Sequence, residues 1–174
     1  MRTAHELECS PRDDKGLPSS ILALGVGNIL LSEKGVGVRV VEAMKEIKLP
    51  DNVELLDGGT GAFDLFDVMA GRDTVIIIDA VKDCGEPVSV YRFRPDDIRM
   101  QRQYLTSVHQ VSLPDTLAIA KFAGFSPHDV IIYGIEPKEI GWDLELSPEV
   151  AAVVPRVMKL VLGELQVECL CRHS

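Results

Sequence analysis

The fold of this chain is constrained most by short apolar runs that end in glycine or in an acidic residue. Residues 20–26 (SILALGV), 74–79 (TVIIID) and 130–135 (VIIYGI) form runs of this kind, and the second is almost entirely β-branched. Continuous apolar runs of this length are typical of strands that are buried on both faces. Weaker patterns predict further strands at residues 53–56 and 88–93, the latter half-buried or at an edge of the sheet.

Segments with helical spacing separate these strands. The sequence predicts helices over residues 35–47, 62–69 and 112–123, and a last helix that begins at Ser147. Apolar residues share one face of the first and of the last helix: Val36, Val40, Met44 and Ile47, and Val150, Val153, Val154, Val157 and Val161. Pro155 should kink the last helix or reset its start. Alternating strands and helices predict the α/β class, as a three-layer αβα sandwich around a mostly parallel, twisted sheet of about five strands.

Length and charge exclude several classes of protein. The 174 residues fit one domain, which we expect over residues 20–165 with flexible tails at 1–19 and 166–174. The net charge of −9, with scattered basic residues, argues against nucleic-acid binding. No apolar run approaches the roughly 20 residues that cross a bilayer, so we expect no membrane insertion. The first residues lack the apolar core of a secretory signal, and the cysteines show no disulfide-framework spacing, so we expect a cytoplasmic protein.

Acidic and imidazole side chains stand where the predicted strands end. Glu33 follows the first strand, Asp57 the second and Asp79 closes the third, while His109 lies just ahead of a predicted helix. Each alone also fits an ordinary capping or loop residue. In an open α/β sheet, however, the carboxyl ends of the strands face the ligand. Carboxylate and imidazole are ligands of metals such as zinc and nickel. Together these residues predict a site that handles a metal, either the protein's own or a partner's.

Gly25-Val26-Gly27 after the first strand also fits a dinucleotide-binding turn, with Asp57 where a ribose-binding acid would stand. The third glycine of that motif is replaced by Leu30, and the loop to Gly35 is long and apolar for a pyrophosphate cradle. Dinucleotide binding is therefore an alternative interpretation with weaker support.

Several segments carry a family resemblance. In this order and spacing, LGVGNILLSEKGVGVRVVE, LLDGGTGAFDL, TVIIIDAV, SVHQ and GIEPKEIGWDLELSPEV resemble the [NiFe]-hydrogenase maturation endopeptidases over about residues 20–165. The resemblance implies a cytoplasmic protease that removes a C-terminal extension from the precursor of the hydrogenase large subunit once nickel is in place. The nickel would be the substrate's, with no tightly bound metal belonging to the protease.

The resemblance also implies site residues. Asp79 and His109 match family positions that contact the substrate's nickel and take part in catalysis. A matching DGGT segment implies a substrate cleft at Asp57, Gly58, Gly59 and Thr60. At the remaining nickel-contacting position, the second of two consecutive acidic residues in the family, this chain has Glu33-Lys34 and so places lysine.

A protonated lysine has no lone pair for a metal, and its charge opposes the metal's. Either Glu33 supplies the missing carboxylate, or Lys34 is deprotonated by burial, or nickel recognition is altered. We favour Glu33 as the third catalytic and nickel-contacting residue, and a Lys34 that simply points to solvent is compatible with this choice.

Sequence gives no support for a nucleophilic side chain, since Ser112 has no identifiable orienting acid and Cys84 no obvious base. A metal, by contrast, can polarise a scissile carbonyl. The lysine leaves a second function open, that of an assembly factor that binds the precursor without cutting it.

Overall fold

A computed structural model describes residues 20–30, 32–59, 65–82, 85–97, 113–124, 126–138 and 145–171. The elements along the chain are β1 (Ile21–Val26), the 3₁₀ turn η1 (Ser32–Gly35), α1 (Val36–Met44), β2 (Val53–Gly59), α2 (Leu65–Met69), β3 (Thr74–Ala80), β4 (Val90–Phe93), α3 (Leu113–Ala123), β5 (Asp129–Ile135), α4 (Pro148–Ala151) and α5 (Val154–Cys171). Within these residues no helix is long and apolar enough to cross a membrane.

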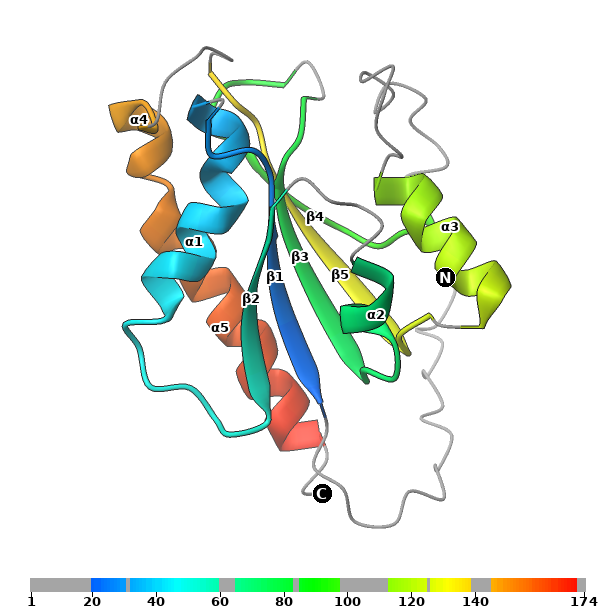
Figure 1. Cartoon of the computed structure of the whole chain (residues 1–174). Helices are drawn as coiled ribbons and strands as arrows, with labels where there is room; N and C mark the ends of the chain where they lie inside the picture. The colour runs from blue at the N-terminus through cyan, green and yellow to red at the C-terminus, as the bar shows by residue number, and fades with distance from the viewer. Residues whose placement is uncertain are drawn as a thin grey trace, which may run out of the picture.

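The strands form one sheet in the order β2-β1-β3-β5-β4 (Figure 1). The pairs β1–β2, β1–β3 and β3–β5 are parallel, whereas β4 pairs antiparallel with β5 at the edge. Helices α1, α4 and α5 cover one face and α2 and α3 the other (Figure 1). This confirms the predicted three-layer α/β fold with a mostly parallel sheet. The four parallel strands all finish at the same end of the sheet, where the chain leaves β1 for η1. We call this end of the sheet its carboxyl edge.

The central strand β3 divides its side chains between two cores. Ile76 and Ile78 are fully buried against α1 and α5, while Val75 and Ile77 are fully buried in the second core, which includes residues of α2 and α3. This alternation follows from the two-residue period of a strand. It places the next residue, Asp79, on the α2/α3 face.

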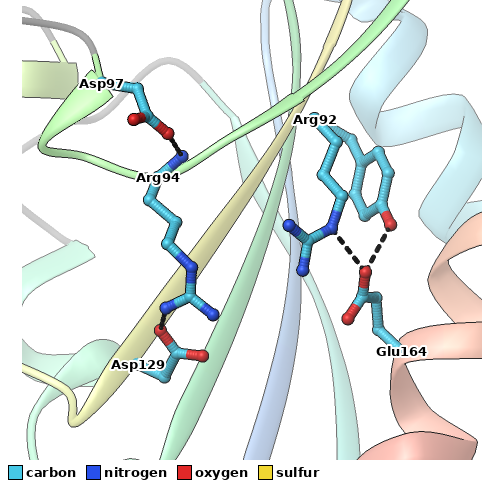
Figure 2. A network of polar contacts seen from close by, with 6 residues as sticks. Arg92, Arg94, Asp97, Asp129 and Glu164 are labelled. Carbon is cyan, nitrogen blue, oxygen red and sulfur yellow. Dashed lines mark hydrogen bonds and ion pairs between the residues drawn. The ribbon is translucent and has the colours of Figure 1, made fainter. Parts of the chain in front are cut away.

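A polar network attaches the edge strand β4 to the rest of the fold. Arg92 Nε of β4 donates to Glu164 Oε1 of α5 at 2.6 Å, and the hydroxyl of Tyr133 on β5 donates to the same oxygen at 2.9 Å (Figure 2). Directly after β4, Arg94 forms an ion pair with Asp129 at the start of β5 (Figure 2). The antiparallel strand is thus held by ion pairs as well as by its ladder.

The helix predictions hold better in the middle of each element than at its ends. Helix α1 buries Val36, Val40 and Met44 as predicted, but it ends at Met44 and leaves Ile47 outside with 39% of its surface exposed. Pro155 does reset the last helix, because α4 ends at Ala151 and α5 starts again at Val154. All of the predicted valine stripe lies in the core on this side of the sheet.

Two other boundaries differ from the prediction. Strand β4 starts at Val90 rather than at 88, because Val88 has a positive φ of 64° that no strand contains. Helix α5 continues to Cys171, so residues 166–171 of the predicted flexible tail are helical. Residues 1–19 and 172–174, and the predicted helix start at 62–64, lie outside the described residues.

Candidate functional site

The site is built on a close approach between the start of α1 and the ends of two strands. A Cβ atom on Gly37 would lie 2.0 Å from the carbonyl oxygen of Ile78 and 2.6 Å from that of Val26. A Cβ atom on Gly25 would lie 2.4 Å from the carbonyl oxygen of Gly37. Only glycine fits at both positions, because real Cβ atoms do not come this close to backbone. The start of α1 is therefore fixed against the carboxyl ends of β1 and β3 by backbone contacts.

Gly27 fixes η1 in the same way. It has a positive φ of 137°, and a Cβ atom there would lie 1.7 Å from the carbonyl oxygen of Lys34. Its N–H donates to the carbonyl oxygen of Gly59 at 2.9 Å, which ties the end of β1 to the end of β2. The Cβ sides of Gly25 and Gly27 are thus occupied by the chain's own backbone. The two glycines therefore serve to pack the chain against itself. This observation argues against the alternative interpretation of a dinucleotide-binding turn.

Asp79 lies at the carboxyl end of β3, as the strand pattern predicts, and its side chain is half-buried. Its Oδ1 accepts the N–H of Ala80 at 2.7 Å. Burial raises the pKa of this carboxyl from 3.8 to about 7, although the Ala80 hydrogen bond and the positive charge of Lys34 lower the pKa. The loss of hydration therefore outweighs the two favourable contacts. Asp79 is a carboxyl group whose ionisation the fold makes costly.

Glu33 and Lys34 both lie in η1, beside the end of β3. Glu33 is almost fully buried, with 1% of its surface exposed. Lys34 is half-buried, and its charge acts on Asp79. The expectation that Lys34 simply points to solvent does not match this placement. A lysine thus lies near the aspartate, at the position where the resemblance leads us to expect an acid.

Three of the four predicted cleft residues, Asp57, Gly58 and Gly59, are part of β2. Asp57 is exposed and its Oδ1 accepts the N–H of Gly59 at 2.8 Å, and Gly59 has a positive φ of 51°. Asp57 and Ile78 are both in register with Gly25, so their side chains point to the same face of the sheet. Asp79 points to the opposite face. Asp57 therefore lies at the same edge as Asp79 but turns away from it.

Two predicted site residues, Thr60 and His109, lie outside the described part of the chain. So do Ser112 and Cys84, for which the sequence supports no role as a nucleophile. Within the described residues, no three His, Cys, Asp or Glu side chains are grouped to hold a metal ion. The role of His109 as a nickel contact therefore stays a prediction.

Sequence reasoning missed one buried acid, Glu136. It follows β5 directly and has 3% of its surface exposed. Its Oε2 and the hydroxyl of Tyr91 lie 3.5 Å and 1.8 Å from the point where a Cβ atom on Gly85 would be. The signal was present, since Glu136 ends an apolar run just as Asp79 does. Glu136 adds a further carboxyl group at the carboxyl edge of the sheet.

A doubly covered, mostly parallel sheet with acidic groups at its carboxyl edge defines an α/β domain that presents its chemistry at the ends of its strands. The hydrogenase maturation protease family model (HycI) matches residues 38–164. The chain is 38% identical over 148 residues to the hydrogenase 2 maturation protease of Escherichia coli (strain K12), covering 84% of this chain and 90% of that protein.

Solved structures agree with the sequence match. The hydrogenase maturating endopeptidase HybD from E. coli superposes with a TM-score of 0.79 at 36% identity, over 86% of this chain and 93% of that one. The hydrogenase 2 maturation peptidase from Thaumarchaeota archaeon SCGC_AB-539-E09 gives a TM-score of 0.60 at 34% identity, over 85% and 99% of the two chains. The chain therefore belongs to the hydrogenase maturation protease family and is a peptidase, which confirms the resemblance seen in the sequence.

Proposed function

We propose that this peptidase removes the C-terminal extension from the nickel-loaded precursor of a [NiFe]-hydrogenase large subunit, in the cytoplasm, and that it recognises the nickel of its substrate. Family membership supports the reaction class. The observation that supports the site is Asp79, a carboxyl group kept half-buried at the carboxyl edge of the sheet with a pKa of about 7.

Burial makes Asp79 a suitable group for recognising a cation that arrives with the substrate. An ionised carboxylate in this position has lost part of its hydration, and a divalent cation restores the lost electrostatic stabilisation. At neutral pH the proton and the cation compete for the same oxygens. The Ala80 N–H and the Lys34 charge keep a fraction of Asp79 ionised before the substrate binds.

We assign the three groups different parts in this reaction. Asp79 and His109 contact the nickel, and the carboxylate of Glu33 is the third contacting group, in place of the family acid that Lys34 replaces. The bound metal orients the scissile peptide bond, and its positive charge polarises the carbonyl group. Asp57 and Gly58 to Thr60 shape the adjoining wall of the cleft. The nickel is cargo of the substrate, and no resident metal is required.

A cleavage assay tests this function. Purified protein is mixed with nickel-loaded and with nickel-free precursor, and the mass of the large subunit is measured. We expect a shortened product from the nickel-loaded form only. Asp79→Asn should abolish cleavage, whereas Asp67→Asn, which changes an exposed acid on α2, should not.

The lysine at the family's acidic position supports a second candidate function, an assembly factor that binds the precursor without cutting it. The same assay separates the two functions. Stable binding of nickel-loaded precursor by the unaltered protein, with no change in the precursor's mass, would exclude the protease function and favour the assembly factor.

A further inference from the structure

The turn between β1 and η1 presents two apolar side chains to solvent. Ile29 is 40% exposed and Leu30 is 54% exposed. The turn is ordered, because Asn28 Oδ1 accepts the N–H of Leu30 at 2.9 Å. Its backbone packs on Gly35, where a Cβ atom would lie 2.9 Å from the Cα atom of Ile29. We call residues 28–30 the apolar turn.

The location of the apolar turn sets it apart from the other exposed apolar residues. It leaves the carboxyl end of β1 and leads into η1, so it lies at the same edge of the sheet as Lys34 and Asp79. Among the described residues, the other large exposed apolar side chains lie after α1, on α3 and on α5: Ile47, Ile119, Phe122 and Leu160. Solvent-exposed loops normally carry polar residues, so an ordered apolar turn beside the site of a peptidase requires an explanation.

We infer that the apolar turn is a docking surface for apolar side chains of the precursor's C-terminal segment, next to the bond that is cut. This inference rests on the proposed function and names the part of the substrate that the turn contacts. A peptidase must hold an extended polypeptide across its site, and the turn is continuous with the segment that carries Glu33 and Lys34. The fixed backbone of the turn requires no ordering when the substrate binds, which favours affinity.

The expected contribution of the turn follows from its exposed surface. Covering an isoleucine and a leucine that are each about half exposed stabilises a complex enough to change its dissociation constant by about 10- to 100-fold. The contacts are the same before and during bond cleavage. They should therefore act on KM and leave kcat unchanged.

The test compares the two apolar residues of the turn with an isoleucine elsewhere that is nearly as exposed as Ile29. The double variant Ile29→Ser/Leu30→Ser removes the apolar surface of the turn, and Ile47→Ser is its matched control. Ile47 is 39% exposed and follows the far end of α1. Both variants alter exposed side chains, so melting temperatures should stay close to that of the unaltered protein. KM, kcat and the dissociation constant are measured with nickel-loaded precursor from the same organism.

We expect the double variant to raise KM and the dissociation constant by about 10- to 100-fold with kcat within about twofold, and Ile47→Ser to change none of them. Equal values for the two variants would overturn the docking surface while leaving the protease function intact. If the unaltered protein binds but does not cut, the protease function fails, and the dissociation constants alone decide whether the apolar turn docks the precursor. If it neither binds nor cuts, both inferences fail.

Discussion

Two half-buried carboxyl groups of this protein lie near a positive charge, and their pKa values shift in opposite directions. The pKa of Glu164 is lowered, because Arg92 and the hydroxyl of Tyr133 both donate to its carboxylate (Figure 2). The pKa of Asp79 is raised to about 7, because burial outweighs the Ala80 hydrogen bond and the charge of Lys34. The difference lies in how fully the surrounding protein replaces the water that each carboxylate loses.

The comparison separates a structural acid, Glu164, from the acid that we propose to be functional, Asp79. Glu164 joins α5 to β4 and β5, because one donor on each of the two strands, Arg92 and Tyr133, bonds to its carboxylate. Asp79 lies at the carboxyl edge of the sheet. A bound substrate can supply there the positive charge that the fold does not provide in full. Functional sites are commonly kept in environments that reduce stability in this way.

The largest expected effect is on catalysis. Asp79→Asn should lower the rate of precursor processing by at least about 1,000-fold, because the amide cannot supply an anionic ligand. Glu164→Gln removes a carboxylate that is also close to a cation but lies away from the carboxyl edge, and it should retain processing within about threefold. Both rates are measured with nickel-loaded precursor by mass spectrometry. Equal losses in the two variants would remove the functional distinction between the acids.

The second effect is on the free energy of unfolding. Replacing Asp79 should lower activity but raise this free energy. The folded pKa of Asp79, about 7, lies above the ordinary value of 3.8, so the folded state binds more protons than the unfolded state between these values. Stability therefore falls as pH rises from about 4 to about 7, on the order of 1 to 4 kcal/mol. Asp79→Asn lacks this loss and should be more stable than the unaltered protein at pH 8, with little difference near pH 4.

Chemical denaturation at both pH values measures this change. A variant that is less stable than the unaltered protein at pH 8 would contradict the raised pKa of Asp79. The result does not depend on any substrate, so it tests the environment of the carboxyl group separately from catalysis.

The third effect is a loss of fold stability when the structural acid Glu164 is replaced. Glu164→Gln weakens two hydrogen bonds to a charged group and should destabilise the fold by about 1 to 3 kcal/mol at pH 7. The pKa of Glu164 is lowered in the folded state, so its contribution is present above the unfolded pKa and is lost as pH falls through the folded pKa. The difference between this variant and the unaltered protein should therefore disappear at acidic pH in the same denaturation series.

The smallest effect concerns Lys34. Lys34→Met removes a charge that lowers the pKa of Asp79, so that pKa should rise by less than about one unit. Carboxyl-carbon NMR titration of Asp79 measures the shift. Lys34→Glu tests the role of Glu33 in the same site: a large gain in processing rate would show that Glu33 is not the third group that contacts the nickel.

Much of the fold could be predicted from the sequence, because its strands are buried runs of β-branched residues and its helices have clear apolar faces. The start of β4 was misplaced, since the positive φ of Val88 is a backbone property that the alternating pattern of residues 88–93 does not reveal. Ile47 continues the spacing of α1, but the helix stops at Met44. A periodic pattern alone does not locate a helix end.

The candidate site was predictable only in part. Asp79 was located from a strand that ends in an acid, and the same signal would have indicated Glu136. The direction of Asp57 depends on the register of β2 with β1, which is a long-range pairing that no local pattern contains. Likewise, the sequence shows that lysine replaces an acid at residue 34, but only the fold shows that its charge acts on Asp79.

The glycine contacts at the start of α1 have a consequence for how this protease can diverge. Gly27 packs on the main chain of Lys34 in η1, and Gly25 and Gly37 pack the start of α1 on the strand ends, all through main-chain atoms. The half-buried side chain of Lys34 takes no part in these contacts. Natural variation at this residue can therefore change the charge of the site while the main-chain contacts that position it are kept.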